Sequence, residues 1–297
     1  MTVPGLHYRP GSYVVEPAWR RWWPLAAHEF LLLFRTKLGV AAFCACLLPL
    51  VVYLFVLMVR FGVVDFGAGP RTQWVARSQA MAKWDPLRPD FFVEMVCGTF
   101  PGLPIVLLLT ATATAGAVAR DRRTNALELL WTRGLGPYAY LFAKWLGSLL
   151  LLGSVTTGAP LLLWGGAVLM AEDWTLFHTT LPFLVPMLGG LLLAAGLWSA
   201  LCVLVSTICA TTHQAVVAWC MLVVGSAALG TVLAVVFRAP SIRTWCSVWE
   251  AGGTLARYLA GVPSRGSVGT AILFLGGLLA VLAILARRRL ALAGAVE

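Results

Sequence analysis

The chain has 297 residues, of which 60% are hydrophobic and 11% are charged. Soluble domains contain roughly half apolar and a quarter charged residues, so this composition excludes a soluble globular protein, whose surface needs more polar groups. The 22 Lys and Arg exceed the 12 Asp and Glu and leave a net charge of +10, which in so apolar a chain indicates an anionic membrane face rather than nucleic acid.

The segment before the first long apolar run (residues 1–37) carries a candidate interfacial helix. Pro24 suits the first turn of a helix, and His28, Glu29 and Arg35 then fall on one side of it, opposite an apolar face. We expect this segment to lie at the cytoplasmic membrane surface.

Six long stretches contain no Asp, Glu, Lys or Arg. A spanning helix needs about 20 mostly apolar residues, and runs without period-two alternation argue against a β-barrel. We therefore predict an all-α integral membrane protein, a single transmembrane domain over residues 1–297, with a six-span core at 38–286 and a cytoplasmic tail at 287–297. The stretches are Leu38 to Val59, Met95 to Ala119, Trp145 to Met170, Leu181 to Cys209, Gln214 to Phe237, and Val268 to Ala286.

The basic residues indicate how the spans are oriented. Six spans place both ends of the chain on one side, and with both ends in the cytoplasm the internal segments carry 13 Lys and Arg against 9 in the external ones. Arg287, Arg288 and Arg289 directly follow the last span. The positive-inside rule thus predicts a multi-pass protein of the cell membrane with both termini cytoplasmic.

The internal loop between the second and third spans has the pattern of a short amphipathic helix. Asp121 suits a helix start, Ala126, Leu127, Leu130 and Trp131 follow at spacings of three and four, and the predicted helix ends at Arg133. Such a helix either lies on lipid or docks a soluble partner, and the pattern alone leaves both open.

This loop resembles the coupling region of type-2 ABC transporter permeases. In that resemblance a charged cluster precedes a small polar stretch, an LELL run, a Gly or Pro break, aromatic residues and a lysine at the next span. The segment from Pro24 to Val40 is similar to the interfacial helix of the same family. The matching loop residues are Arg120, Asp121, Arg122, Arg123, Thr124, Asn125, Ala126, Leu127, Glu128, Leu129, Leu130, Thr132, Gly134, Pro137, Tyr138, Tyr140 and Lys144.

The resemblance implies the permease subunit of an ATP-driven exporter. Its expected partners are a separate ABC ATPase subunit, which would bind the ATP and Mg, a second permease copy or paralogue, and the lipid bilayer, with no cofactor in this chain and no nucleic acid. Residues expected to couple the spans to the ATPase are Asp121, Arg122, Arg123, Leu127, Glu128, Leu130, Trp131 and Arg133.

Small residues on the second span are expected to let helices pack closely. These residues are Gly98, Gly102, Ala111, Ala115 and Ala119.

The family also commonly carries short helices before the last span that dip back toward the membrane. In this chain they would fall in residues 238–267, with Trp245, Val248, Trp249 and Leu255 on an apolar side. Gly252 and Gly253 would form a break.

Several other chemistries are absent from the sequence. None of the three lysines follows Gly in a phosphate-binding GxxxxGK[ST] loop, so we expect no ATPase in this chain, and His28 and Glu29 begin an HExxH pattern that Leu32 breaks. Seven scattered cysteines do not describe a disulfide framework, although an external bridge between Cys97 and Cys246 stays open.

Two other function classes remain open. One is a non-transporting structural or sensor membrane protein whose loop helix docks another partner. The other is an ion-coupled secondary carrier, which usually keeps a charged residue inside the bilayer, whereas the six predicted spans contain none.

Overall fold

The computed structural model describes residues 18–60, 89–99, 101–127, 136–171, 174–264 and 266–294. All regular elements in these ranges are helical, and six stretches are long and apolar enough to cross a membrane. The predicted all-α, multi-pass architecture is therefore confirmed at this level. The six stretches are Lys37–Met58, Gly102–Arg123, Pro137–Met170, Thr175–Ile208, Thr212–Val236 and Val268–Arg289.

The individual helices follow one another with short connections. They are α1 (Ala18–Leu32), η1 (Leu33–Arg35), α2 (Lys37–Arg60), α4 (Pro89–Cys97), α5 (Gly102–Ala113), α6 (Ala117–Arg123), α8 (Pro137–Thr156), α9 (Gly158–Met170), α10 (Thr175–Ile208), α11 (Thr212–Cys220), η2 (Met221–Gly225), α12 (Ser226–Val236), α13 (Ile242–Cys246), α14 (Val248–Leu259) and α15 (Val268–Gly294).

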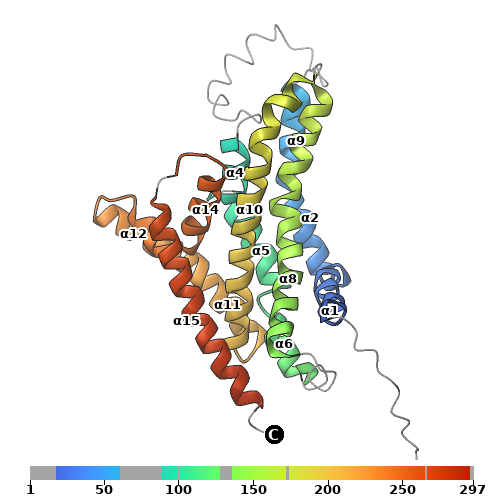
Figure 1. Ribbon diagram of the computed structural model, residues 1–297, viewed down its shortest axis with the longest axis vertical. Helices are drawn as coiled ribbons and strands as arrows, with labels where there is room; N and C mark the ends of the chain where they lie inside the picture. Colours follow the sequence, from blue (N-terminus) through green and yellow to red (C-terminus); the bar gives the residue numbers. More distant parts are fainter. Residues whose placement is uncertain are drawn as a thin grey trace, which may run out of the picture.

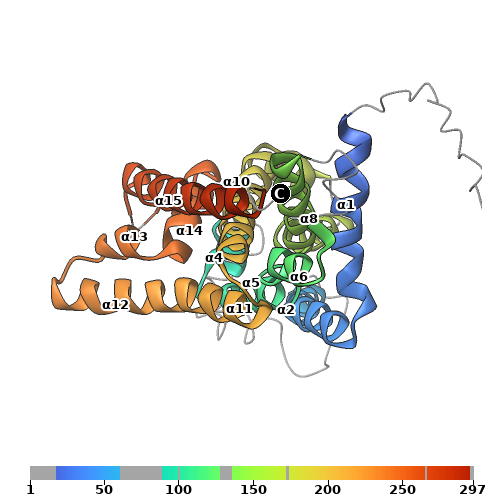
Figure 2. The same ribbon diagram turned by 90° about the horizontal axis from the view of Figure 1, so that it is seen from below.

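Helix α10 forms the centre of the bundle and contacts α8, α14 and α15 (Figures 1 and 2). Helix α1 lies beside α8, and it shares the lower end of the molecule in Figure 1 with α6 and the C terminus. The peripheral passages α2, α11–α12 and α15 bury fewer than a quarter of their residues inside the protein. Exposed apolar side chains on these helices are what a lipid environment requires.

The second passage is interrupted twice, which differs from the single predicted span that starts at Met95. The first interruption separates α4 from α5, and a Cβ on Gly102 would lie 2.0 Å from the carbonyl oxygen of Val96. The second separates α5 from α6, and a Cβ on Gly116 would lie 2.2 Å from Cγ2 of Thr212 on α11. Glycine is required at both positions because backbone approaches a neighbour more closely than a side chain permits.

The third passage begins at Pro137, eight residues before the predicted start at Trp145. Proline is favoured in the first turn of a helix, where its missing N–H is not needed. The earlier start places Lys144 on the same helix as the charge-free run, seven residues after Pro137. The stretch Pro137–Met170 has 34 residues and is about 51 Å long, which exceeds the roughly 30 Å of a hydrocarbon core.

The predicted short helices before the last span are present as α13 and α14. Val248, Trp249 and Leu255 are buried as expected, but Trp245 is 50% exposed. The predicted break at Gly252 and Gly253 is wrong, because both lie within α14 and pack against neighbouring elements.

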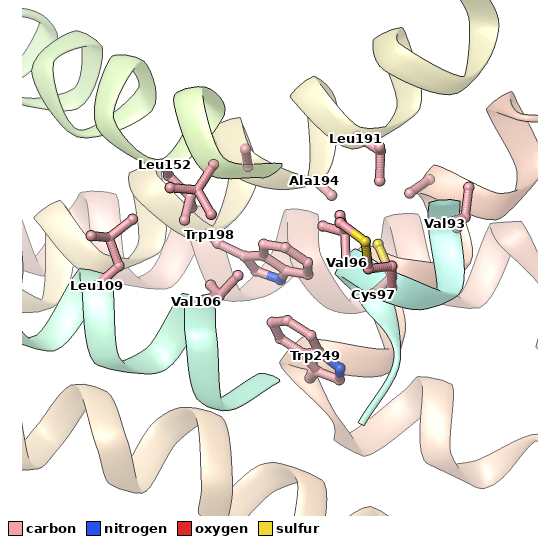
Figure 3. Close-up of a cluster of buried hydrophobic side chains, with 14 of the residues drawn as sticks. Val93, Val96, Cys97, Val106, Leu109, Leu152, Leu191, Ala194, Trp198 and Trp249 are labelled. Atoms are coloured by element: carbon pink, nitrogen blue, oxygen red, sulfur yellow. The ribbon is translucent and has the colours of Figure 1, made fainter. Parts of the chain in front are cut away.

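Helix α14 packs against the middle of α10 through two tryptophans. The rings of Trp198 and Trp249 stack with centroids 4.3 Å apart and planes 7° from parallel, and Figure 3 shows them among the buried side chains of α4, α5 and α10. At 1.5 Å per residue, Trp198 lies about 15 Å from the end of α10 at Ile208, and Gly190, which contacts Ala256 of α14, lies about 27 Å from it. Because α10 has 34 residues and is about 51 Å long, these contacts place α14 beside its middle part.

Candidate functional site

A buried cluster of charges joins three helices at the end of the molecule that carries α1. Lys144 of α8 forms ion pairs with Glu29 of α1 and with Asp121 of α6, the latter at 2.5 Å between Nζ and Oδ2. Its side chain is 1% exposed, and that of Glu29 is 8% exposed. Arg120 adds a second cation, with Nη2 3.6 Å from Oε2 of Glu29. Two carboxylates and two cations therefore balance in this cluster.

One face of α8 builds this cluster. Tyr140 and Lys144 are four residues apart, so they lie on the same side of the helix, and the Tyr140 hydroxyl donates a 2.8 Å hydrogen bond to Oδ2 of Asp121. Gly147 continues the face by another turn, and a Cβ there would lie 2.8 Å from both the Ala26 carbonyl oxygen and the Cβ of Glu29. The absence of a side chain at Gly147 lets α1 approach closely enough for Glu29 to reach Lys144.

Each charged residue of the cluster is stable in its buried position only while its oppositely charged partners are present. Removing charges from water costs several kcal/mol per ion, and neighbouring opposite charges offset that cost only while the set is complete. Loss of one partner from a buried pair is accordingly destabilising by about 3–5 kcal/mol. The cluster thus holds α1, α6 and α8 in one fixed arrangement.

A second set of contacts joins α6 to the end of α10. The Ser206 hydroxyl of α10 accepts hydrogen bonds from the backbone N–H groups of Val118 and Ala119, at 3.1 and 3.3 Å. In the other direction the Arg122 guanidinium donates to the Thr207 carbonyl oxygen at 2.7 Å. The first turn of a helix has free N–H groups and the last turn has free carbonyls, so each helix caps the other. Helix α6 is therefore separated from α5 but fastened to α10.

The predicted loop helix does not begin at Asp121. Helix α6 continues through Asp121 to Arg123, and the chain turns at Asn125, whose φ is +54°, before it becomes helical again at Ala126. Asp121 does not cap a helix because its carboxylate is held by Tyr140 and Lys144. Asparagine tolerates the left-handed region better than most residues, which explains the position of the turn.

The structure describes only part of the expected coupling residues. Leu127 is buried and packs with Val118, Tyr140 and Val203, which brings α6, α8, α10 and the start of the loop helix together. Arg123 is exposed. The remaining expected residues lie outside the described residues, namely Glu128, Leu130, Trp131 and Arg133.

The small residues of the second passage have separate roles. Ala115 and Ala119 are fully buried, as helix packing requires, and Ala111 is half-buried. Gly98 lies in the first interruption and Gly102 begins the helix that follows it, so they serve the break in the passage rather than contacts between passages. Gly116, which was not expected, provides the close approach to α11.

Sequence reasoning did not predict that Glu29, Arg120, Tyr140 and Lys144 come together as a group. All four belong to the segments that resemble the permease family, but their grouping depends on how α1 folds back on α8. The signal that could have found them is the rarity of lysine, since Lys144 is one of three in the chain and borders a long apolar run.

A smaller charged group joins α4 and α14, away from the end that carries α1. Arg257 of α14 donates to Glu94 of α4 at 2.8 Å, and its Nη1 lies 3.8 Å from Oε2 of Glu250. Burial acts to lower the pKa of Arg257, but the hydrogen bond and charge of Glu94 outweigh it and hold this pKa above its usual value. Arg257 therefore stays charged and ties α4 to α14. Cys97 and Cys246 are separate thiols in the structure.

The described part of the chain contains no group of three or more His, Cys, Asp or Glu placed to hold a metal ion. No protein-family model matches the chain, and no curated protein sequence matches it.

Proposed function

We propose that this chain is the membrane-spanning subunit of an ATP-driven exporter of the type-2 ABC permease kind. A separate ATPase would dock in the cytoplasm at the loop that follows α6, and two permease subunits would form the pathway. Both termini would face the cytoplasm, and α1 would lie at the inner surface of the cell membrane.

The observation that carries this proposal is the way the loop is fastened. The loop that resembles a coupling region follows α6 directly. Helix α6 is bound to α10 by Ser206 and Arg122, to α8 by Asp121, and to α1 by the ion pair of Arg120 with Glu29. A force applied to the loop would therefore act on three passages through polar contacts. The interruption at residues 114–116 would let α6 move relative to α5.

The test uses an ATPase with a P-loop that is encoded beside this chain. The two proteins are produced together, purified and reconstituted in vesicles, and ATP hydrolysis is measured with and without the permease. We expect the double substitution Leu127→Asp and Trp131→Asp to abolish co-purification and stimulation. Ser241→Asp, an exposed position at the opposite end, serves as the matched control for added charge. Unchanged assembly and stimulation in the double variant would refute the coupling assignment.

An ion-coupled carrier is the second candidate. The charge-free runs of the sequence offered no group for ion coupling, whereas the structure contains a buried charge cluster. Asp121 and Glu29 are carboxylates close to a buried lysine, an arrangement that a proton-coupled mechanism could use. Transport in vesicles separates the two candidates. Transport by a carrier would continue without ATP and stop when the ion gradient is collapsed. Transport by the exporter would stop without ATP and continue without the ion gradient.

A further inference from the structure

The fifth passage, Thr212–Val236, is divided near its middle by a π-helical segment. Helix α11 ends at Cys220, the residues Met221–Gly225 form the π-helix η2, and α12 begins at Ser226. π-Helices are rare in proteins, and short π segments inside α-helices occur frequently at functional sites and at kinks. The surroundings of η2 indicate what this segment does.

On one side of η2, α11 is fastened to the second passage at two points. Trp219 is fully buried, and its indole N–H donates a 2.7 Å hydrogen bond to the hydroxyl of Thr110 in α5. At the other end of α11, Thr212 lies against Gly116, where α6 begins. Helix α11 therefore belongs to the same group of helices as α5 and α6.

On the other side of η2, α12 is fastened to different elements. The Ser226 hydroxyl accepts a 3.2 Å hydrogen bond from the backbone N–H of Val248, the first residue of α14, where a helix has free N–H groups. A Cβ on Gly230 would lie 3.4 Å from the Cα of Arg243 in α13. Figure 2 shows α11 beside α5 and α6, and α12 continuing away from them toward α13.

The segment between these two sets of anchors is weakly packed. Val223 is buried, but Met221 and Val224 are exposed. Gly225 is also exposed, and a Cβ there would have nothing within 4 Å, so this glycine does not serve a close approach. Glycine lowers helix stability relative to alanine. The fifth passage is thus least constrained at the place where its anchors change.

Helix α10 limits how the two groups of helices can move. It contacts α14 through Trp198 and α6 through Ser206, which are about 12 Å apart along one continuous helix. The groups therefore cannot separate, and relative motion is restricted to a turn about α10. Because the fifth passage crosses from one group to the other, it has to bend when they turn.

We propose that Met221–Gly225 is a hinge at which the angle between α11 and α12 changes. Helix α11 moves with α5 and α6, and α12 moves with α13 and α14. A bend of about 20° would displace the far end of α12 by about 6 Å, because its 11 residues are about 16 Å long. The hinge does not depend on the proposed ATPase partner.

Distances between spin labels test the hinge in the full chain in nanodiscs. The seven native cysteines are replaced, and pulsed electron paramagnetic resonance is recorded for two pairs of introduced cysteines. The first pair joins Leu150 of α8 to Val236 at the end of α12, and the control pair joins Leu150 to Val217 of α11. All three positions are exposed. We expect the distance distribution of the first pair to be broader by about 6 Å. Equal widths of the two distributions would overturn the proposal.

Variants at Gly225 then assign the motion to η2. A π turn holds about one residue more than an α turn, so deletion of Gly225 should make the passage a continuous α-helix and narrow the first distribution to the width of the control. Gly225→Ala is the second variant, and Gly189→Ala, at an equally open and exposed position of α10, is its matched control. Thermal unfolding checks that each variant is folded. An unchanged width in the folded deletion variant, or in Gly225→Ala where the deletion variant does not fold, would overturn the proposal.

Variants of the anchors test whether the two sides of η2 are held separately. Ser226→Ala removes the hydrogen bond to α14 and should broaden the first distribution while the control distribution stays unchanged. Trp219→Phe removes the hydrogen bond to α5 and should broaden both. The matched control is Thr231→Val, because the hydroxyl of Thr231 donates within α12 and is exposed. Identical effects of Ser226→Ala and Trp219→Phe on the two pairs would show that α11 and α12 move as one rod, and would overturn the proposal.

Discussion

Lys144 is a buried charged residue of α8, and its surroundings indicate a structural role in holding helices together. It is almost completely enclosed, and its ammonium group lies between carboxylates from two other helices. Its Nζ also lies 5.5 Å from the centre of the Tyr140 ring. A buried charge is tolerated when it is paired in this way, so its presence alone does not identify a transport pathway.

Replacing Lys144 with Met should destabilise the protein by about 3–5 kcal/mol, because the carboxylates of Glu29 and Asp121 would remain buried without their main cation. Thermal unfolding in detergent measures the change. The matched control is Lys37→Met, which removes an exposed lysine at the start of α2 and should change stability by no more than about 0.5 kcal/mol. Adding Glu29→Gln to Lys144→Met should recover part of the loss. Equal stability of the two lysine variants would show that the cluster does not hold α1 in place.

At the scale of helices, the reciprocal caps between α6 and α10 are the feature with the clearest consequence. Ser206 satisfies donors that the interruption of the second passage leaves free, and Arg122 satisfies acceptors at the end of α10. Neither contact could be predicted from the sequence, because 88 residues separate Ser206 from Val118 and 85 residues separate Arg122 from Thr207.

Arg122→Met should loosen the end of α10, since a hydrogen bond from a charged group contributes about 1.5–3 kcal/mol and methionine keeps only the apolar part of the side chain. Hydrogen exchange measured by mass spectrometry should become roughly 10- to 100-fold faster in residues 203–209. Arg123→Met, one residue away and exposed, is the comparison and should leave exchange in this segment unchanged. Equal exchange in the two variants would show that Arg122 does not cap α10.

The number and approximate limits of the passages were predictable, because apolar length depends on membrane thickness alone. The start of the helix that carries the third passage was not predictable. A run without charged residues ends at Lys144, but the helix continues past this residue because carboxylates from α1 and α6 pair with its ammonium group. Asp121 shows the same difficulty. Its residue type favours a helix start, but in the structure its carboxylate is bound by Tyr140 and Lys144 instead. Gly252 was read as a break, yet α14 continues through it because Trp198 packs against the bare backbone.

On the scale of the whole molecule, the orientation of the chain decides which end can meet an ATPase. The chain segment around α1, α6 and the C terminus lies at one end, and α14 lies farther up, beside the middle of α10 (Figure 1). The excess of Lys and Arg, 13 against 9, predicts that the first of these ends faces the cytoplasm. An ATPase can reach the loop after α6 only in that orientation.

Thiol labelling tests this orientation with two exposed positions that differ only in the end at which they lie. Single cysteines are introduced as His213→Cys, between α10 and α11, and Ser241→Cys, between α12 and α13, in a chain whose seven native cysteines are replaced. A membrane-impermeant maleimide applied to intact cells should label the cysteine at 241 and leave the one at 213 unlabelled until the membrane is permeabilised. The opposite pattern would place the loop after α6 outside the cell, where ATP hydrolysis by a cytoplasmic subunit could not act on it. The exporter proposal would then fail, while the charge cluster would keep its structural basis.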